Sequence, residues 1–162
     1  LLTFMDPSRD LLGAGYNVNQ SIIAVGSGGL LGRGLGAGSQ SQLHFLPEAQ
    51  TDFIFSVIAE ELGFVGAPVV LIAFFILFWR FLRLARLSSS VFGMYLVLAI
   101  MFLFLAQLIF NVGGTLGLLP ITGVTLPFVS NGGSSVVMSL LFIGIVQSVA
   151  HSSVSKVVGG NS

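Results

Sequence analysis

The sequence predicts an all-α integral membrane protein, a polytopic helical bundle with about three transmembrane helices and a large outer loop. Hydrophobic residues make up 54% of the 162 residues and charged residues only 7%. Soluble domains carry about a quarter charged residues. The mean hydropathy of +1.01 points the same way. The chain contains no cysteine, which excludes disulfides and thiolate metal sites.

Residues 1–51 are expected to form an extracytoplasmic loop that lies partly on the membrane surface. Turn-forming residues recur as far as Gln20, and glycine then recurs among Ile, Val and Leu from Ser21 to Gln42, so we expect no stable helix there. A phosphate-binding loop is the alternative, but the run lacks the Gly-Lys-Ser/Thr ending. Because the chain opens on Leu1 without Met or a basic stretch, we expect a fragment whose earlier spans are missing.

Three apolar segments have the length and composition of membrane-spanning helices. They cover residues 52–79, 91–112 and 132–150. Arg80, Arg83 and Arg86 follow the first of them in an expected short loop over 80–90. Positive charge in a short loop marks the cytoplasmic side. The acidic loop before this span is therefore expected to face outward.

The segment 113–131 is apolar but is interrupted by Pro120, Gly123 and Pro127. Its apolar stretch is too short to cross about 30 Å of hydrocarbon, so we expect an extracytoplasmic re-entrant or interfacial loop. Three crossings then place the Ser-rich tail, 151–162, in the cytoplasm, and the lysine in this tail agrees with that side.

Acids are rare in this chain, so those near the first span are candidates for function. Asp52 is expected at the outer interface, where partial desolvation makes a carboxylate a stronger base. The alternative is a helix cap, in which Thr51 or Asp52 accepts from free backbone amides. Glu60 and Glu61 point about 100° apart on a helix. Two arrangements are open. In the first, one of these acids faces other helices or a watery cavity; in the second, both acids lie among lipid headgroups.

Other polar side chains have structural explanations. Gln107 and Asn111 lie four residues apart on one helical face, and Gln147 lies deep in the last span, so all three suit interhelical hydrogen bonds. Arg33 is the lone cation of the glycine-rich run and suits either a phosphate or a lipid headgroup. The two histidines fall on opposite sides of the membrane, and no metal site is predicted.

Several short motifs occur in a characteristic order and spacing. They include Gly26-Ser27-Gly28-Gly29, Phe45-Leu46-Pro47-Glu48, Thr51-Asp52-Phe53-Ile54-Phe55, Glu60-Glu61-Leu62-Gly63, Leu126-Pro127-Phe128-Val129-Ser130 and Gly132-Gly133-Ser134-Ser135. Over nearly its whole length the chain resembles the SEDS polymerases (shape, elongation, division and sporulation), typified by RodA, FtsW and SpoVE. Because members of this family have about ten helices, the resemblance implies that the chain is the C-terminal portion.

The resemblance implies a peptidoglycan glycosyltransferase that polymerises lipid II at the outer face of the bacterial cytoplasmic membrane, for cell shape, elongation or division. It maps the family's essential aspartate onto Asp52 as the catalytic residue. The expected substrate-binding residues are Glu48, Gln50, Thr51, Arg33, Ser39, Gln40, Glu60, Ser130, Ser134 and Ser135. Two positions depart from the family pattern: Gln50 stands where many members carry His, and Asn131 stands where an aromatic residue is common.

The implied partners are lipid II, the undecaprenyl pyrophosphate-linked glycan, membrane lipids and a class B penicillin-binding protein, with no nucleic acid. Arg33, a divalent cation such as Mg²⁺ or Mn²⁺, or groups from missing helices would neutralise the leaving pyrophosphate. Two other functions stay open. A lipid II flippase or transporter would depend on Glu60, Glu61 and Gln147, and a non-catalytic scaffold would bind a penicillin-binding transpeptidase. We expect no activity from these 162 residues alone.

Overall fold

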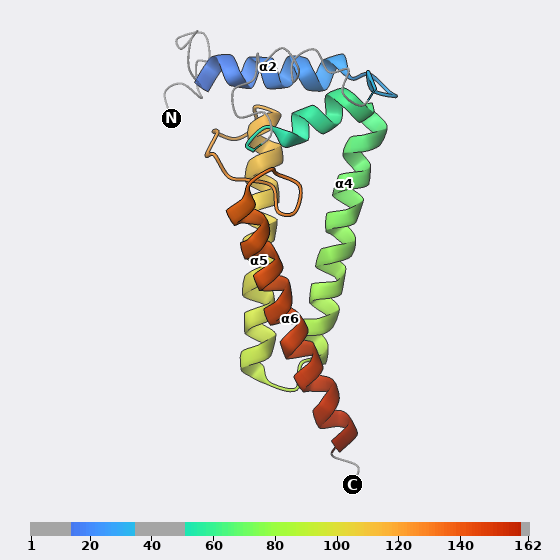
Figure 1. Cartoon of the computed structure of the whole chain (residues 1–162), viewed down its shortest axis with the longest axis vertical. Helices are drawn as coiled ribbons and strands as arrows, with labels where there is room; N and C mark the ends of the chain where they lie inside the picture. The colour runs from blue at the N-terminus through green and yellow to red at the C-terminus, as the bar shows by residue number, and fades with distance from the viewer. Residues whose placement is uncertain (1–13, 35–50, 160–162) are drawn as a thin grey trace.

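The computed structural model describes residues 14–34 and 51–159. These residues form four helices and no strand. The helices are α2 (Ala14–Ser27), α4 (Ile54–Leu87), α5 (Val91–Thr115) and α6 (Gly133–Gly159), as Figure 1 shows. Three segments of the described chain are long and apolar enough to cross a membrane: Ile54–Leu87, Val91–Thr115 and Gly133–Ser153. The predicted all-α membrane fold is therefore confirmed.

Helices α4 and α5 form an antiparallel hairpin around the short turn 88–90. The hydroxyl of Ser90 caps α5 by accepting from the backbone N of Gly93 at 3.0 Å. The hydroxyl of Ser153 accepts from the backbone N of Ser89 at 3.1 Å and so ties α6 to this turn. The turn is shorter than the loop predicted over 80–90, because the helix continues to Leu87. Arginine and leucine are good helix formers, and cations stabilise the end of a helix.

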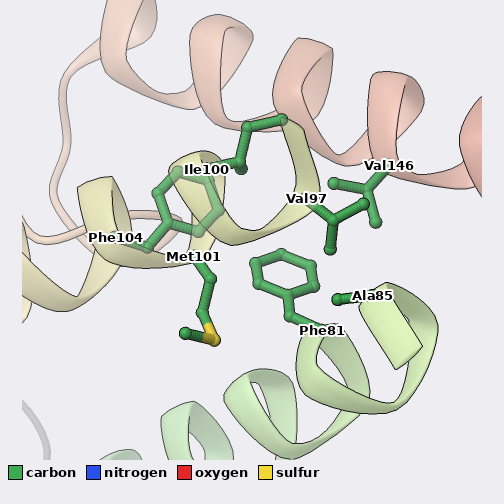
Figure 2. Packing of buried hydrophobic residues seen from close by; sticks show 7 residues of the cluster. All are labelled: Phe81, Ala85, Val97, Ile100, Met101, Phe104 and Val146. Atoms are coloured by element: carbon green, nitrogen blue, oxygen red, sulfur yellow. The ribbon is translucent and has the colours of Figure 1, made fainter. Parts of the chain in front are cut away.

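A cluster of buried apolar side chains joins the three long helices (Figure 2). Its members are Phe81 and Ala85 from α4, Val97, Ile100, Met101 and Phe104 from α5, and Val146 from α6. In a membrane such a cluster is held by close van der Waals packing, since lipid tails are as apolar as the side chains. The Phe104 ring also lies 6.1 Å from the Phe142 ring of α6. This packing holds the middle of α6 against α5.

Helix α4 bends at Gly63, whose φ of 67° and ψ of −162° are not helical. The part before the bend, 54–62, runs beside α2, and the part after it runs along α5 (Figure 1). The sequence prediction of a span over 52–79 did not include this bend. Glycine reaches this left-handed φ without a steric penalty, and a bend here leaves backbone groups of the helix without their usual partners.

The glycine-rich residues 28–34 bind the backbone groups that the bend sets free. The four bonds are Phe64 N to Gly29 O at 2.8 Å, Val65 N to Leu30 O at 3.3 Å, Arg33 N to Glu60 O at 3.0 Å and Gly34 N to Glu61 O at 3.0 Å. Two donors and two acceptors of the broken ladder are thus paired outside the helix. We call residues 28–34 the bend clamp.

Helix α2 corrects two predictions, a loop up to Gln20 and no stable helix from Ser21 to Gln42. Ser21, Ala24 and Gly28 recur at helical spacing, are all buried, and form a face of small residues. A side chain on Gly28 would collide with the backbone O of Ala59, so the two segments touch closely. Tertiary packing of this face outweighs the poor helix propensity of glycine.

Helix α5 ends in a Schellman motif at Gly117, which has a φ of 70°. The backbone N of Leu118 donates to Gly113 O at 2.8 Å, and the N of Gly117 donates to Gly114 O at 3.1 Å. The following segment, 116–132, contains neither helix nor strand before α6 begins. We call it the connecting segment, because its backbone contacts position the site described next.

Candidate active site

The start of α4, the end of α5, helix α2 and the connecting segment lie at one end of the molecule, away from the turn 88–90 (Figure 1). Asp52 is partly exposed and lies just before α4. It borders a void of about 10 Å³ together with Asn111, Thr115 and Thr122. A space of this size suits about one water molecule or one small polar group.

Ser130 holds the backbone just before Asp52. Its hydroxyl donates to the carbonyl of Thr51 at 2.6 Å and accepts from the backbone N of Leu126 at 2.8 Å. Ser130 is only 2% exposed. In this arrangement its hydroxyl serves the protein backbone, and the predicted contact of Ser130 with substrate stays a prediction.

Asn111 holds the backbone at Asp52 itself. Its Nδ2 donates to the carbonyl of Asp52 at 2.9 Å and to the carbonyl of Val124 at 2.8 Å. The sequence predicted interhelical hydrogen bonds for Asn111, but both bonds go to non-helical backbone. The signal in the sequence was its place at the outer end of a span, next to residues 113 and 114, both glycine.

The Asp52 side chain does not cap α4. The N-cap residue is Phe53, and no side chain makes a cap hydrogen bond there. The Asp52 carboxylate instead faces Gly123, where an added Cβ would lie 3.4 Å from Oδ2. Among residues 14–34 and 51–159, no hydrogen bond or ion pair of this carboxylate is found. Within this part of the chain, the carboxylate is open to a ligand.

Glu60 and Arg33 meet at the bend of α4 rather than beside Asp52. Glu60 is fully buried, whereas Glu61 is partly exposed, so the two acids lie in different environments. Arg33 is exposed, and its Nε donates to Ser27 O at 3.3 Å. Glu60 lies eight residues after Asp52, which corresponds to roughly 12 Å along the helix. The structure thus splits the predicted site residues into two groups.

Ser134 and Ser135 border a cavity of about 370 Å³ at the start of α6. The Ser135 hydroxyl is hydrogen-bonded to the Thr125 hydroxyl at 2.8 Å, and Ser134 is exposed. Gln107 also lines the cavity, and its Oε1 is buried with no hydrogen-bond partner among the described residues. The polar rim could therefore accept hydrogen-bond donors from a ligand.

An apolar groove of about 340 Å³ lies between α4 and residues 127–129 of the connecting segment. Its α4 wall consists of Val69, Val70, Ala73, Phe74 and Leu77. Phe128 holds a left-handed φ of 64°, and its ring packs edge-on against Phe104 at 5.5 Å. Sequence reasoning missed this groove, which has the shape and chemistry to take a hydrocarbon chain.

Four of the predicted substrate residues lie outside the described residues: Glu48, Gln50, Ser39 and Gln40. Gln147, which the transporter alternative requires, is exposed on α6. In the described parts of the chain, no cluster of His, Cys, Asp and Glu is suited to hold a metal ion.

Comparison with known proteins identifies the family. The model of the FtsW, RodA and SpoVE family, described as cell cycle protein, matches residues 1–155. Stage V sporulation protein E of Bacillus subtilis is 41% identical over 151 residues, which are 93% of this chain and 41% of that protein. Peptidoglycan glycosyltransferase MrdB of Escherichia coli K12 is 45% identical over 149 residues, which are 92% of this chain and 40% of that protein.

A solved structure described as "Structural coordination of polymerization and crosslinking by a peptidoglycan synthase complex" has the same fold, with a TM-score of 0.79 and 31% identity. The match covers 94% of this chain and 40% of that one. The chain therefore spans about two fifths of the length of the relatives it matches. Since the family model covers nearly all of it, the chain belongs to the FtsW, RodA and SpoVE family, as its motifs predicted.

Proposed function

We propose that this protein, in its full natural chain, is a glycosyltransferase that polymerises lipid II into peptidoglycan strands, with Asp52 as its general base. Relatives of the same family are named peptidoglycan glycosyltransferases. The observation that carries the proposal is the environment of the Asp52 backbone and carboxylate. The backbone is held by Asn111, while the carboxylate borders a small void and has no hydrogen bond or ion pair among residues 14–34 and 51–159.

In the proposed reaction, Asp52 takes the proton from the sugar 4-hydroxyl of one lipid II. The freed oxygen forms a bond to the anomeric carbon of the growing chain, and the bond from that carbon to undecaprenyl pyrophosphate breaks. The pyrophosphate leaves with the electron pair, and the anomeric centre inverts. General-base help of this kind contributes about 10² to 10⁴-fold in rate.

The lipid part of the substrate needs an apolar surface, and the leaving pyrophosphate needs positive charge. The groove beside Phe74 and Phe128 supplies the first. Arg33 is the cation described at the Asp52 end of the molecule, and a divalent cation such as Mg²⁺ or Mn²⁺ would add charge stabilisation. Glu60 and Ser134 stay candidates for substrate contact.

The proposed orientation places the Asp52 end outside the cytoplasmic membrane. Arg80, Arg83 and Arg86 lie near the opposite end of α4, and positive charge is retained on the cytoplasmic side. The proposed partner is a class B penicillin-binding transpeptidase, which would crosslink the new strands. This agrees with the likeness to a peptidoglycan synthase complex.

A transporter is the second candidate, and the burial of Glu60 at the bend of α4 is the observation that favours it. The two functions depend on different acids.

We would measure strand synthesis and lipid II translocation in vesicles for Asp52→Asn, Glu60→Gln and Glu61→Gln. A polymerase loses synthesis with Asp52→Asn and keeps it with the partly exposed control Glu61→Gln. Translocation that depends on Glu60, with synthesis absent from the wild type, would instead establish a transporter.

A further inference from the structure

We propose that Asn111 is a positioning residue that holds Asp52 in its reactive orientation. This inference rests on the proposed function of Asp52. The carbonyl of Asp52 lies outside the hydrogen-bond ladder of α4, because the first helical amides, those of Ser56 and Val57, donate to the carbonyl of Phe53. The hydrogen bond recorded for the Asp52 carbonyl within the described residues comes from Asn111.

The geometry fixes the orientation of the Asn111 amide. An asparagine amide has two N–H donors on nitrogen and none on oxygen. Both neighbours, the carbonyls of Asp52 and Val124, are acceptors, so the nitrogen must face them. One side chain from α5 therefore joins the residue before α4 to the connecting segment, as Ser130 also does through the carbonyl of Thr51.

The oxygen of the same amide supports a role at the site. Asn111 is only 4% exposed, and its Oδ1 is buried without a hydrogen-bond partner in the described part of the protein. Asn111 also borders the void that Asp52 borders. Leaving a buried acceptor unpaired is costly, so a residue chosen only for packing would be apolar. The oxygen suits a water molecule or a substrate hydroxyl in that void.

Loss of the two donors should mainly affect the reaction and not the binding of substrate. A carboxylate acts as a base only within hydrogen-bond reach of the proton it removes. A displacement of about 1 Å in a reacting group costs roughly 100-fold in rate. We therefore expect Asn111→Leu, which is close in volume but has no donor, to lower kcat about 100-fold. The KM for lipid II should stay within about threefold, because Asn111 does not carry the lipid.

The test uses the full natural protein, purified with its transpeptidase partner and supplied with lipid II. Strand synthesis is measured for Asn111→Leu and for Asn111→Gln, which restores a two-donor amide on a longer arm. Asn111→Gln should recover activity to within about tenfold of wild type. Ser90→Ala is the matched control, since it removes a hydrogen bond at the opposite end of the same helix and leaves the site intact.

Activity is normalised to folded protein, measured by size-exclusion chromatography and thermal unfolding. If Asn111→Leu does not fold, Asn111→Ser, which keeps one donor, takes its place with an expected fall in kcat of about tenfold. An unchanged kcat in a folded variant would overturn the proposal. The proposal would also be overturned if Ser90→Ala lost as much activity as Asn111→Leu at the same loss of thermal stability. A rise in KM with an unchanged kcat would overturn it as well.

A double variant separates this inference from the proposed function. If Asn111 acts through Asp52, adding Asn111→Leu to Asp52→Asn should change the residual rate by less than about twofold. A further 100-fold loss would show that Asn111 acts independently and would overturn the inference. Full activity of Asp52→Asn alone would instead dismiss the general base, whatever the result at Asn111.

Discussion

Gly32 and Gly63 pack backbone against backbone at the bend of α4. A Cβ added to Gly63 would collide with the backbone N of Gly32, and a Cβ on Gly32 would collide with the carbonyl of Glu61. Both glycines have a left-handed φ, 77° at Gly32 and 67° at Gly63. The bend therefore depends on two positions that accept no side chain.

Replacing Gly63 by alanine should release the bend clamp. The new methyl group meets backbone atoms that have no room to move, and the left-handed φ adds strain. We expect Gly63→Ala to lower stability by about 1 to 3 kcal/mol, seen as a fall in the midpoint of thermal unfolding in detergent.

Gly26→Ala is the control for this prediction. A Cβ at Gly26 would meet no atom within 4 Å, and the residue lies inside α2. Alanine there should leave stability unchanged or raise it by up to about 1 kcal/mol. Equal effects of the two alanines would show that the contact between Gly32 and Gly63 does not hold the bend.

Ser21 should couple α2 to the rest of the site. Its buried hydroxyl is hydrogen-bonded to the Ser56 hydroxyl at 2.6 Å and donates to the Thr115 carbonyl at 2.7 Å. Ser21→Ala leaves these buried groups unpaired and should cost about 1 to 3 kcal/mol.

Hydrogen exchange would reveal where that loss occurs. We expect faster exchange of the α2 amides in Ser21→Ala than in Ser27→Ala. Among the residues that the structure describes, the Ser27 hydroxyl bonds only within its own helix, to Ala24 O at 2.9 Å. Slow exchange in both variants would mean that α2 is held by its apolar contacts alone.

Ser130 should matter for the backbone next to Asp52. Ser130→Ala removes one partner from Leu126 N and one from the carbonyl of Thr51. We expect a loss of about 1 to 3 kcal/mol in thermal unfolding, because Ser130 is buried. Ser134→Ala, at an exposed position, should change stability by less than about 0.5 kcal/mol. Equal stability of both variants would contradict the structural role of Ser130.

The membrane-spanning helices were predictable because lipid forces every backbone group of a span to be paired within its own helix. Long apolar runs therefore identify spans directly. The end of α4 was less predictable, since the arginines that were predicted to mark the cytoplasmic side are also good helix formers. They continue α4 to Leu87 instead of starting a loop.

Helix α2 and the bend were missed for a common reason. The sequence shows where glycine occurs but not which glycine has a left-handed φ, because that depends on packing between distant segments. Gly28 and Gly63 both look like helix breakers in the sequence. In the structure, Gly28 packs closely against the backbone of Ala59, and Gly63 ends the first part of α4. Helix propensity is a weak guide where tertiary contacts decide the backbone conformation.

Asp52 is a candidate base from its motif alone, but the side chains that surround it could not be predicted. The bond from Asn111 to the Asp52 carbonyl spans 59 residues, and that from Ser130 to the Thr51 carbonyl spans 79. No periodic pattern in the sequence predicts hydrogen bonds between residues so far apart. The sequence therefore predicted the candidate base, and the structure revealed the side chains that hold it.

The most direct test of the proposed function is synthesis of glycan strands from purified lipid II by the full natural protein with its transpeptidase partner. Wild type, Asp52→Asn and Asp52→Glu would be compared at equal amounts of folded protein. The account predicts strands from the wild type, none from Asp52→Asn, and at most a small residual rate from Asp52→Glu, whose longer arm misplaces the carboxylate. Wild-type yields of strands from folded Asp52→Asn would contradict it.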